Sequence, residues 1–457
     1  MAIRGLCVTI DPMRIVTGSS LPLLMGVLVA ASGVAAQAPS QFGVDAPELA
    51  RLGLFAVGTR TLQLVSRDQV DVLSFDPVSG QAARRDRKLS VELWYPARIK
   101  PGAHRAVYTA SLPAEPPASP VSFSVPGIAV RSADPAGANY PLVIVSHGYS
   151  NDPVAMTWLT ENLASKGYVV AAIRHDDPPI TDRSKFAQVL MRRPLDIVFV
   201  ATALKKMLTA EHLIDPSRLA LVGYSMGGYG VLTAAGATLD PTGSPAHTVP
   251  GDLLQPYVRG ARLQDAVMID GVKAVVAISP AGGGTLAAWG AQGLSGIKAP
   301  LLLISGDRDR TVDYASGARA IFDAAVNAQR YLLTFKGAGH SMGLNPAPDA
   351  MRQRLWDQDW FEDPVWRKER LNAITAHFIT AFLGRHVNGD ETLATYLNVR
   401  VADSSKGLWP ANVPPLTYDA FSPDAAEVTV WKGFQRRHAE GLELLQAAPT
   451  ERSRLIR

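Results

Sequence analysis

The sequence predicts a doubly wound α/β fold: a mostly parallel sheet covered by helices, with antiparallel strands on its N-terminal side and a C-terminal extension. Six short apolar runs recur along the chain, and helical stretches separate several of them. Such runs, apolar on both faces, are typical of strands in a parallel sheet. Hydrophobic residues make up 47% of the 457 residues, enough for a large buried core. The runs lie at 142–145, 169–173, 219–222, 274–278, 301–304 and 331–335.

Further strands are predicted before this alternation begins. Residues 61–96 have strand character, and the segment Asp76 to Gly80 carries turn residues that suit a hairpin. Residues 111–141 are rich in proline, alanine and serine and are predicted to form a loop. We therefore assign residues 37–140 to N-terminal strands with a Pro-rich loop, and residues 141–385 to the α/β core.

Helices and loops are predicted from the same patterns. Pro194 to Leu208 is the clearest helix, with Pro194 at its first position. A second helix is expected over about 364–385, ending near Gly384, and a third near 434–446, inside the C-terminal extension 386–457. Residues 240–270 interrupt the alternation with turn residues. For them we favour a plain surface loop slightly over a lid.

The N-terminal segment predicts export. Between Arg14 and Asp45 no residue is charged, and an apolar run from Leu21 ends in small residues at Ala36. This pattern is typical of a secretory signal peptide, so residues 1–36 are expected to be removed, leaving a periplasmic or secreted protein without a stable membrane span. An uncleaved anchor is the alternative, but the run is short for a span of about 20 residues.

Charge and cysteine content exclude several function classes. The only cysteine, Cys7, lies in the segment predicted to be cleaved, which removes disulfide, thiolate and cysteine-metal chemistry from the mature chain. The net charge of +4 is too small a surplus to suggest a nucleic-acid partner. The sequence does not predict an oligomeric state.

A serine motif directly follows the third apolar run. LALVGYSMGG (219–228) places Ser225 in a Gly-x-Ser-x-Gly pattern between a strand and a small-residue stretch, Gly230 to Ala237, expected to be helical. Such a sharp turn needs glycines because it leaves no room for nearby side chains, and it projects the hydroxyl above the sheet edge. We expect Ser225 to be a nucleophile; the alternative is a glycine-rich turn with a bystander serine.

A serine nucleophile needs a base and a carboxylate behind that base. His340 directly follows the last apolar run, in FKGAGHSMG (335–343), and Asp309 follows the 301–304 run. Asp307 is the rival carboxylate, although it could instead cap its turn or pair with a neighbouring arginine. The order Ser225, Asp309, His340 is that of α/β-hydrolases.

The loop after the first apolar run, LVIVSHGYS (142–150), predicts an oxyanion hole. The backbone amides of Tyr149 and Met226 would donate to a tetrahedral oxyanion. We expect the ring of His147 to brace this loop and Gly148 to let the backbone approach the substrate. The full set of expected pocket residues is His147, Gly148, Tyr224, His175 and Met342. Of the residues around the site, Tyr149, Tyr224, Met226 and Met342 are expected to line an apolar pocket, which suggests a short acyl or aromatic ester.

Residues 174–177 (RHDD) follow another apolar run and could be taken for a metal cluster. Its one histidine and two adjacent aspartates face different ways, which is poor ligand geometry. We favour a loop that shapes the pocket, and expect no metal and no other cofactor.

Several phrases of the chain resemble a known family. VELWYPA (91–97), LVIVSHGYS, LASKGYVVAAIRHDD (163–177), RPLDIVFV (193–200) and GYSMGGYG (223–230) are similar to α/β-hydrolases related to platelet-activating factor acetylhydrolase. Bacterial proteins labelled predicted dienelactone hydrolases share the pattern, which covers about 90–345. The resemblance implies an α/β-hydrolase fold, a Ser225–Asp309–His340 triad and oxyanion amides from Tyr149 and Met226. Dienelactone hydrolases proper have a cysteine at the position of Ser225.

The expected function is therefore a secreted serine carboxylic-ester hydrolase that forms an acyl-enzyme on a small-molecule or lipid ester. Two alternatives remain open. An acyltransferase or amidase would use the same triad, and a binding protein could keep the fold without turnover.

Overall fold

A sheet of twelve strands organises the part of the chain that the structure describes. The computed structural model describes residues 42–112, 120–179, 182–353, 355–408, 428–435 and 437–450. The predicted signal peptide, 1–36, lies outside these ranges. None of the helices within them is long and apolar enough to cross a membrane.

The six predicted core strands are confirmed, and each pairs in parallel with its neighbours. Their order across the sheet is β11-β10-β9-β8-β6-β7, so β6 lies between β8 and β7 and the chain reverses its direction of travel there. In open α/β sheets, ligands bind at the carboxyl ends of the strands beside such a reversal. The strands are β6 (Tyr140–Ser146), β7 (Val169–Arg174), β8 (Ile214–Tyr224), β9 (Val272–Ile278), β10 (Leu301–Gly306) and β11 (Arg330–Phe335).

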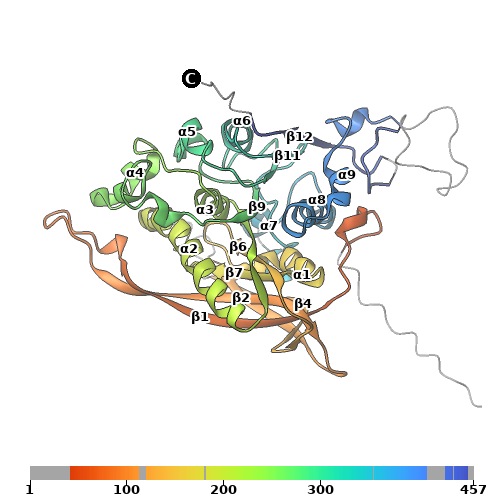
Figure 1. The fold of residues 1–457 in the computed structure, drawn as a ribbon, viewed down its shortest axis with the longest axis horizontal. Coiled ribbons are helices and arrows are strands. Elements are labelled where there is room, and N and C mark those ends of the chain that lie inside the picture. Colours follow the sequence, from red (N-terminus) through yellow and green to blue (C-terminus); the bar gives the residue numbers. More distant parts are fainter. Residues whose placement is uncertain are drawn as a thin grey trace, which may run out of the picture. The chain divides into compact units, whose positions relative to one another are not determined.

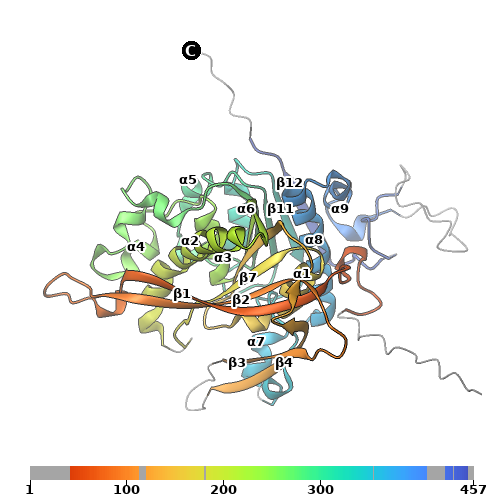
Figure 2. The same ribbon diagram turned by 60° about the horizontal axis from the view of Figure 1, so that its bottom comes forward.

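The antiparallel strands expected on the N-terminal side are also present. β7 pairs antiparallel with β2 (Arg84–Arg98), which pairs antiparallel with β1 (Ala56–Val70). These long strands lie along one side of the core in Figures 1 and 2. The hairpin between them turns where expected: the Gly80 amide donates to the Asp76 carbonyl oxygen over 2.9 Å, and Gly80 has φ 66°.

The prediction of a loop over 111–141 is wrong in part. β3 (Arg105–Leu112) pairs with β4 (Val121–Arg131), and β5 (Asp134–Pro135) pairs with β2. Phe123 of β4 packs edge-to-face on Phe361, with ring centroids 5.8 Å apart, so the strand buries an apolar side chain. β4 pairs with β1 only near its C-terminal end, which leaves an open edge that tolerates Pro126. Figure 2 shows β3 and β4 beside the helix α7 (Leu355–Phe361).

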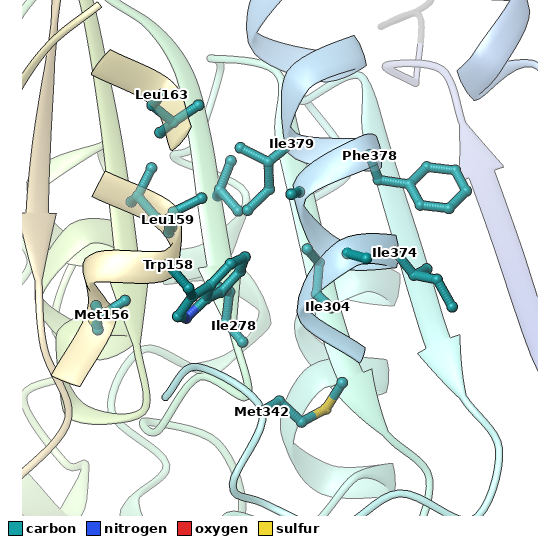
Figure 3. Packing of buried hydrophobic residues seen from close by; sticks show 14 of the residues in the cluster. Met156, Trp158, Leu159, Leu163, Ile278, Ile304, Met342, Ile374, Phe378 and Ile379 are labelled. Atoms are coloured by element: carbon teal, nitrogen blue, oxygen red, sulfur yellow. The ribbon is translucent and has the colours of Figure 1, made fainter. Parts of the chain in front are cut away.

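Helices cover both faces of the sheet, as the fold class predicts. Alternate strand residues point to opposite sides: Val143 and Val145 face α1 (Thr157–Ser165) and α8 (Lys368–Asn388), and Leu142 and Ile144 face the other layer. In Figure 3, Leu159 and Ile379 of these two helices pack above Ile278 and Ile304 of the strands. The other layer contains α2 (Phe186–Ala210), α3 (Met226–Ala234), α5 (Gly290–Leu294) and α6 (Ala320–Ala324).

Two predicted helix ends are corrected. α2 begins at Phe186, so Pro194 lies inside the helix rather than at its start. Proline lacks the amide that would bond the Leu190 carbonyl oxygen, and the hydroxyl of Tyr229 donates to that oxygen instead, over 2.9 Å. α8 continues past Gly384 to Asn388 and ends at Gly389, whose φ of 73° suits a helix terminus.

The C-terminal extension adds a strand where a helix was predicted. Within 434–446, residues from Leu442 onward belong to β12 (Leu442–Ala447), which pairs antiparallel with β11. Leu442 and Leu444 are buried at alternate positions, which is the period of a strand. Leu445 between the polar positions is also apolar, so the sequence of this short segment does not show that period clearly. Trp431 packs on Phe378 of α8, with ring centroids 5.8 Å apart. Along the chain, the helix α9 (Ala394–Leu397) lies between α8 and Trp431.

Residues 240–270 fold into α4 (Ser244–Thr248) and three short 3-10 helices, Pro250–Asp252, Gln255–Tyr257 and Gln264–Val267. α4 and the last of these pack against α2.

Candidate active site

Ser225 occupies a strained turn at the carboxyl end of β8. Its φ of 53° and ψ of −117° are rare for a residue with a side chain. Hydrogen bonds hold the turn on both sides: the Ser225 amide donates to the Ile278 carbonyl (2.9 Å), and its carbonyl accepts from the Ala281 amide (3.0 Å).

The glycines around Ser225 are required by close backbone contacts, as the motif predicts. A Cβ on Gly227 would lie 1.9 Å from the Ser146 carbonyl oxygen. A Cβ on Gly223 would lie 2.2 Å from the Gly227 carbonyl oxygen. No side chain fits at either position, so the turn that presents Ser225 depends on both glycines.

The structure brings Ser225, His340 and Asp309 together. His340 Nε2 lies 3.0 Å from Ser225 Oγ, and His340 Nδ1 lies 2.8 Å from Asp309 Oδ2. An ionised carboxylate only accepts hydrogen bonds, so Nδ1 carries the proton and the Nε2 lone pair faces the serine hydroxyl. This is the arrangement in which a histidine can take the hydroxyl proton.

Asp309 is held as an anion. Burial alone would raise its pKa, but the hydrogen bond and charge of His340, together with hydrogen bonds from two backbone amides, lower the pKa. The amides of Thr311 and Val312 also donate to Oδ1, over 2.9 and 3.2 Å. The rival Asp307 turns elsewhere and accepts from the Gly337 amide over 2.6 Å.

The loop that carries His340 is fixed from three directions. The Tyr224 hydroxyl donates to the His340 carbonyl oxygen over 3.1 Å. Asp363 accepts from the Gly339 amide over 2.7 Å, and the Nζ of Lys368 donates to the Ser341 carbonyl oxygen. The sequence did not single out Lys368 or Asp363, because neither follows a core strand and no motif marks them.

The two amides expected to bind an oxyanion belong to the residue after Ser225 and to the loop that carries Gly148. Met226 is the first residue of α3, where a helix leaves its amides without intrahelical acceptors. Within the described ranges, the Tyr149 amide makes no hydrogen bond. Gly148 brings its loop beside the nucleophile: a Cβ there would lie 3.4 Å from Ser225 Cβ.

Most of the expected pocket side chains are buried. His147, His175, Tyr224 and Met342 are at most 4% exposed and present almost no surface to a ligand. Met342 packs in the core between α1 and α8 (Figure 3). By contrast, Tyr149 is partly exposed, and its ring packs on Phe186, with centroids 5.4 Å apart. Burial raises the pKa of its hydroxyl to about 12.

His147 braces its own loop, as expected for the ring. Its Nδ1 donates to the Gly148 carbonyl oxygen over 2.7 Å, and its Nε2 accepts from the His175 amide over 3.3 Å. Burial holds the pKa of His147 well below its usual value, which keeps the ring neutral.

A second Ser-His-Asp chain lies beneath the first. His175 Nδ1 lies 3.0 Å from Asp196 Oδ2, and its Nε2 lies 2.9 Å from Ser146 Oγ. The side chains of His175 and Asp196 are 1% and 3% exposed and Ser146 is fully buried, whereas the His340 side chain is 18% exposed. Burial also lowers the pKa of His175 to about 3. The second chain therefore ties β6 to α2 and offers no surface to a substrate.

The family model described as "PETase: PET hydrolase-like" matches residues 126–241, the stretch that holds the Tyr149 loop and the Ser225 turn. The chain has the α/β-hydrolase fold, and over this stretch its sequence resembles that of a PET hydrolase-like enzyme. Over 96 residues this α/β-hydrolase is 33% identical to Cutinase est1 of Thermobifida alba, covering 21% of this chain and 30% of the cutinase. Over 98 residues it is 34% identical to Cutinase 2 of Thermobifida cellulosilytica, covering 21% and 34%.

The alignments thus span about a third of each of these two cutinases. A solved ferulic acid esterase from Streptomyces cinnamoneus is similar at 21% identity and a TM-score of 0.46, over 73% of this chain and 91% of the other. The narrower resemblance to platelet-activating factor acetylhydrolase is not confirmed by these matches.

Proposed function

We propose that this α/β-hydrolase is a serine carboxylic-ester hydrolase. The observation that carries the proposal is the relay from Ser225 Oγ through His340 to Asp309, with hydrogen-bond distances of 3.0 and 2.8 Å. The cutinase relatives and the PET hydrolase-like family model support the same reaction class.

In the acylation half of the reaction, Ser225 Oγ attacks the ester carbonyl carbon while His340 Nε2 takes its proton. The buried Asp309 carboxylate stabilises the imidazolium that forms. The amides of Tyr149 and Met226 donate to the oxyanion, and each such donor typically lowers the barrier by about 3–4 kcal/mol. The intermediate collapses, and the alcohol leaves with the proton held by His340.

In deacylation, a water molecule attacks the acyl-serine ester while His340 again takes a proton. The second tetrahedral intermediate uses the same two amides. Its collapse returns the proton to Ser225 Oγ and releases the carboxylic acid. This cycle needs only side chains and amides of the chain, together with water.

For the substrate we propose an ester with a short or aromatic acyl group. Tyr149, whose amide would hold the oxyanion, is partly exposed, and we expect its ring to offer an aromatic surface to the acyl group. The PET hydrolase-like family model also favours an aromatic acyl group.

The proposed function is tested with p-nitrophenyl esters from acetate to palmitate and with bis(2-hydroxyethyl) terephthalate. We expect hydrolysis that falls sharply beyond butyrate, includes the terephthalate, and is lost in Ser225→Ala. Flat or rising rates toward palmitate would refute the short-acyl pocket. Equal rates for the wild type and Ser225→Ala would refute the mechanism.

We also propose that the protein is exported. The uncharged apolar run that ends at Ala36 supports this. N-terminal sequencing of the protein recovered from a bacterial periplasm is expected to start shortly after residue 36. An intact N-terminus in the membrane fraction would show an anchor instead.

A further inference from the structure

Two motifs with no part in the proposed reaction meet beneath the oxyanion loop. Asp177 ends the RHDD motif after β7, and Arg193 begins the RPLD motif inside α2. Their side chains form an ion pair and are 5% and 0% exposed. A charge pair this deeply buried loses its hydration, so its retention calls for a structural or functional explanation.

The pair holds the backbone on both sides of Tyr149. Arg193 donates to the His147 carbonyl oxygen over 2.8 Å. Asp177 Oδ2 accepts from the Ser150 amide over 3.1 Å. Both contacts are to main-chain groups, so the pair acts on the path of the loop and contributes no side chain to the ligand side.

The amide of Tyr149 belongs to the peptide unit that begins with the Gly148 carbonyl. A peptide unit is planar and its N–H points opposite to its C=O, so fixing the Gly148 carbonyl also fixes the direction of the Tyr149 N–H. The Gly148 carbonyl accepts from the ring of His147 over 2.7 Å. Arg193 holds the carbonyl of that same histidine, so the orientation of the oxyanion donor traces back to Arg193.

Arg193 also contacts the helix that follows the nucleophile. A Cβ on Gly230 of α3 would lie 2.7 Å from Arg193 Cγ, so the arginine stem packs directly on that helix. α3 supplies the Met226 amide, and the guanidinium of Arg193 supports the loop of Tyr149. One side chain thus links the elements that carry the two donors.

We propose that Arg193 is a positioning residue of the oxyanion hole, acting through the His147 carbonyl and through Asp177 to orient the Tyr149 amide. This inference rests on the proposed function. A purely structural ion pair would affect stability alone, whereas a positioning residue affects the transition state after the chain has folded.

The test compares Arg193→Met, Asp177→Asn, the double variant and Arg193→Lys with the wild type. Arg330→Met is the matched control, because Arg330 is also buried and donates to the carbonyl oxygens of Phe322 and Ala448. The readouts are kcat and KM for p-nitrophenyl acetate, the thermal midpoint, and the rate of labelling by a fluorophosphonate. In that labelling, Ser225 Oγ bonds to phosphorus, fluoride leaves and the serine proton passes to His340.

For Arg193→Met we expect kcat to fall about 10–100-fold while KM stays within about threefold of the wild-type value. This fall in kcat is smaller than the one caused by removing an oxyanion donor altogether. The labelling rate is expected to fall by a similar factor, because the phosphoryl oxygen occupies the same hole. In the double variant the thermal midpoint recovers, since no unpaired charge stays buried, but kcat stays low. Arg193→Lys keeps the charge and is expected to fold well and to restore kcat only in part. Arg330→Met is expected to lower the midpoint alone.

Two results would overturn the inference while leaving the proposed function intact. One is a folded Arg193→Met or Arg193→Lys enzyme with wild-type kcat and labelling rate. The other is a double variant in which kcat recovers together with the thermal midpoint. A wild-type protein that neither hydrolyses the ester nor is labelled would refute the proposed function itself, and the positioning role with it.

Discussion

The Tyr229 hydroxyl donates a 2.9 Å hydrogen bond to the Leu190 carbonyl oxygen, the acceptor that Pro194 leaves free inside α2. Tyr229→Phe is therefore expected to lower the free energy of unfolding by about 1–3 kcal/mol, because a buried carbonyl loses its partner. Urea titration measures this cost. In a Pro194→Ala background the alanine amide can bond Leu190, so the cost of Tyr229→Phe should shrink. An equal cost in both backgrounds would contradict this explanation.

Asp309 and Asp307 lie two residues apart but have different partners. Asp309→Asn removes the carboxylate that orients the His340 ring and stabilises its imidazolium form. The kcat for p-nitrophenyl acetate should therefore fall about 10³–10⁴-fold. Asp307→Asn is the matched control, since an amide oxygen can still accept from Gly337, and its kcat should stay within about threefold. A larger loss of kcat in Asp307→Asn than in Asp309→Asn would show that Asp307, and not Asp309, is the carboxylate that acts on His340.

The Ser225 turn depends on Gly227. An alanine there would place Cβ 1.9 Å from the Ser146 carbonyl oxygen, and neither backbone can move without breaking the sheet edge. Gly227→Ala should therefore destabilise the protein by more than about 3 kcal/mol or prevent folding. Gly102→Ala, with φ 78° and open space around it, should cost about 1 kcal/mol, from backbone strain alone. Similar thermal midpoints for the two variants would refute the packing argument.

Lys166 makes stability depend on pH. Burial lowers its pKa to about 7, although Nζ donates to the Leu49 carbonyl over 2.6 Å and to Thr380 over 2.8 Å. In the unfolded chain the pKa of this lysine is about 10.5. Between about pH 7 and pH 10.5 the unfolded chain therefore binds more protons than the folded chain, so this group makes stability rise with pH. Lys166→Met should reduce the slope of unfolding free energy against pH by up to about 1.4 kcal/mol per pH unit. The exposed Lys206→Met should leave the slope unchanged, and an unchanged slope in both would refute the assignment.

The sequence was sufficient to predict the sheet and the three residues of the relay. Ser225, Asp309 and His340 each follow a buried apolar run, and the carboxyl ends of parallel strands share one edge of a sheet. Position along the chain therefore predicted proximity in space.

Features that depend on contacts between distant segments were not predictable in this way. The early start of α2 depends on a hydroxyl from α3, and β12 depends on an open edge at β11. The burial of His175 and Met342 depends on helices packed over them, so their places beside strand ends did not indicate how deeply they would be buried. The local sequence pattern indicates the hydrophobic period of a helix or strand, but it does not indicate which distant element packs against it.

Ser225, and not Ser146, is the proposed nucleophile, although each lies at the end of a Ser-His-Asp chain. The most direct measurement is fluorophosphonate labelling of the wild type, Ser225→Ala and Ser146→Ala, followed by mass mapping of the modified peptide. We expect labelling at Ser225 in the wild type, its loss in Ser225→Ala and its retention in Ser146→Ala. Labelling that persists in Ser225→Ala, or that maps to Ser146, would contradict this assignment.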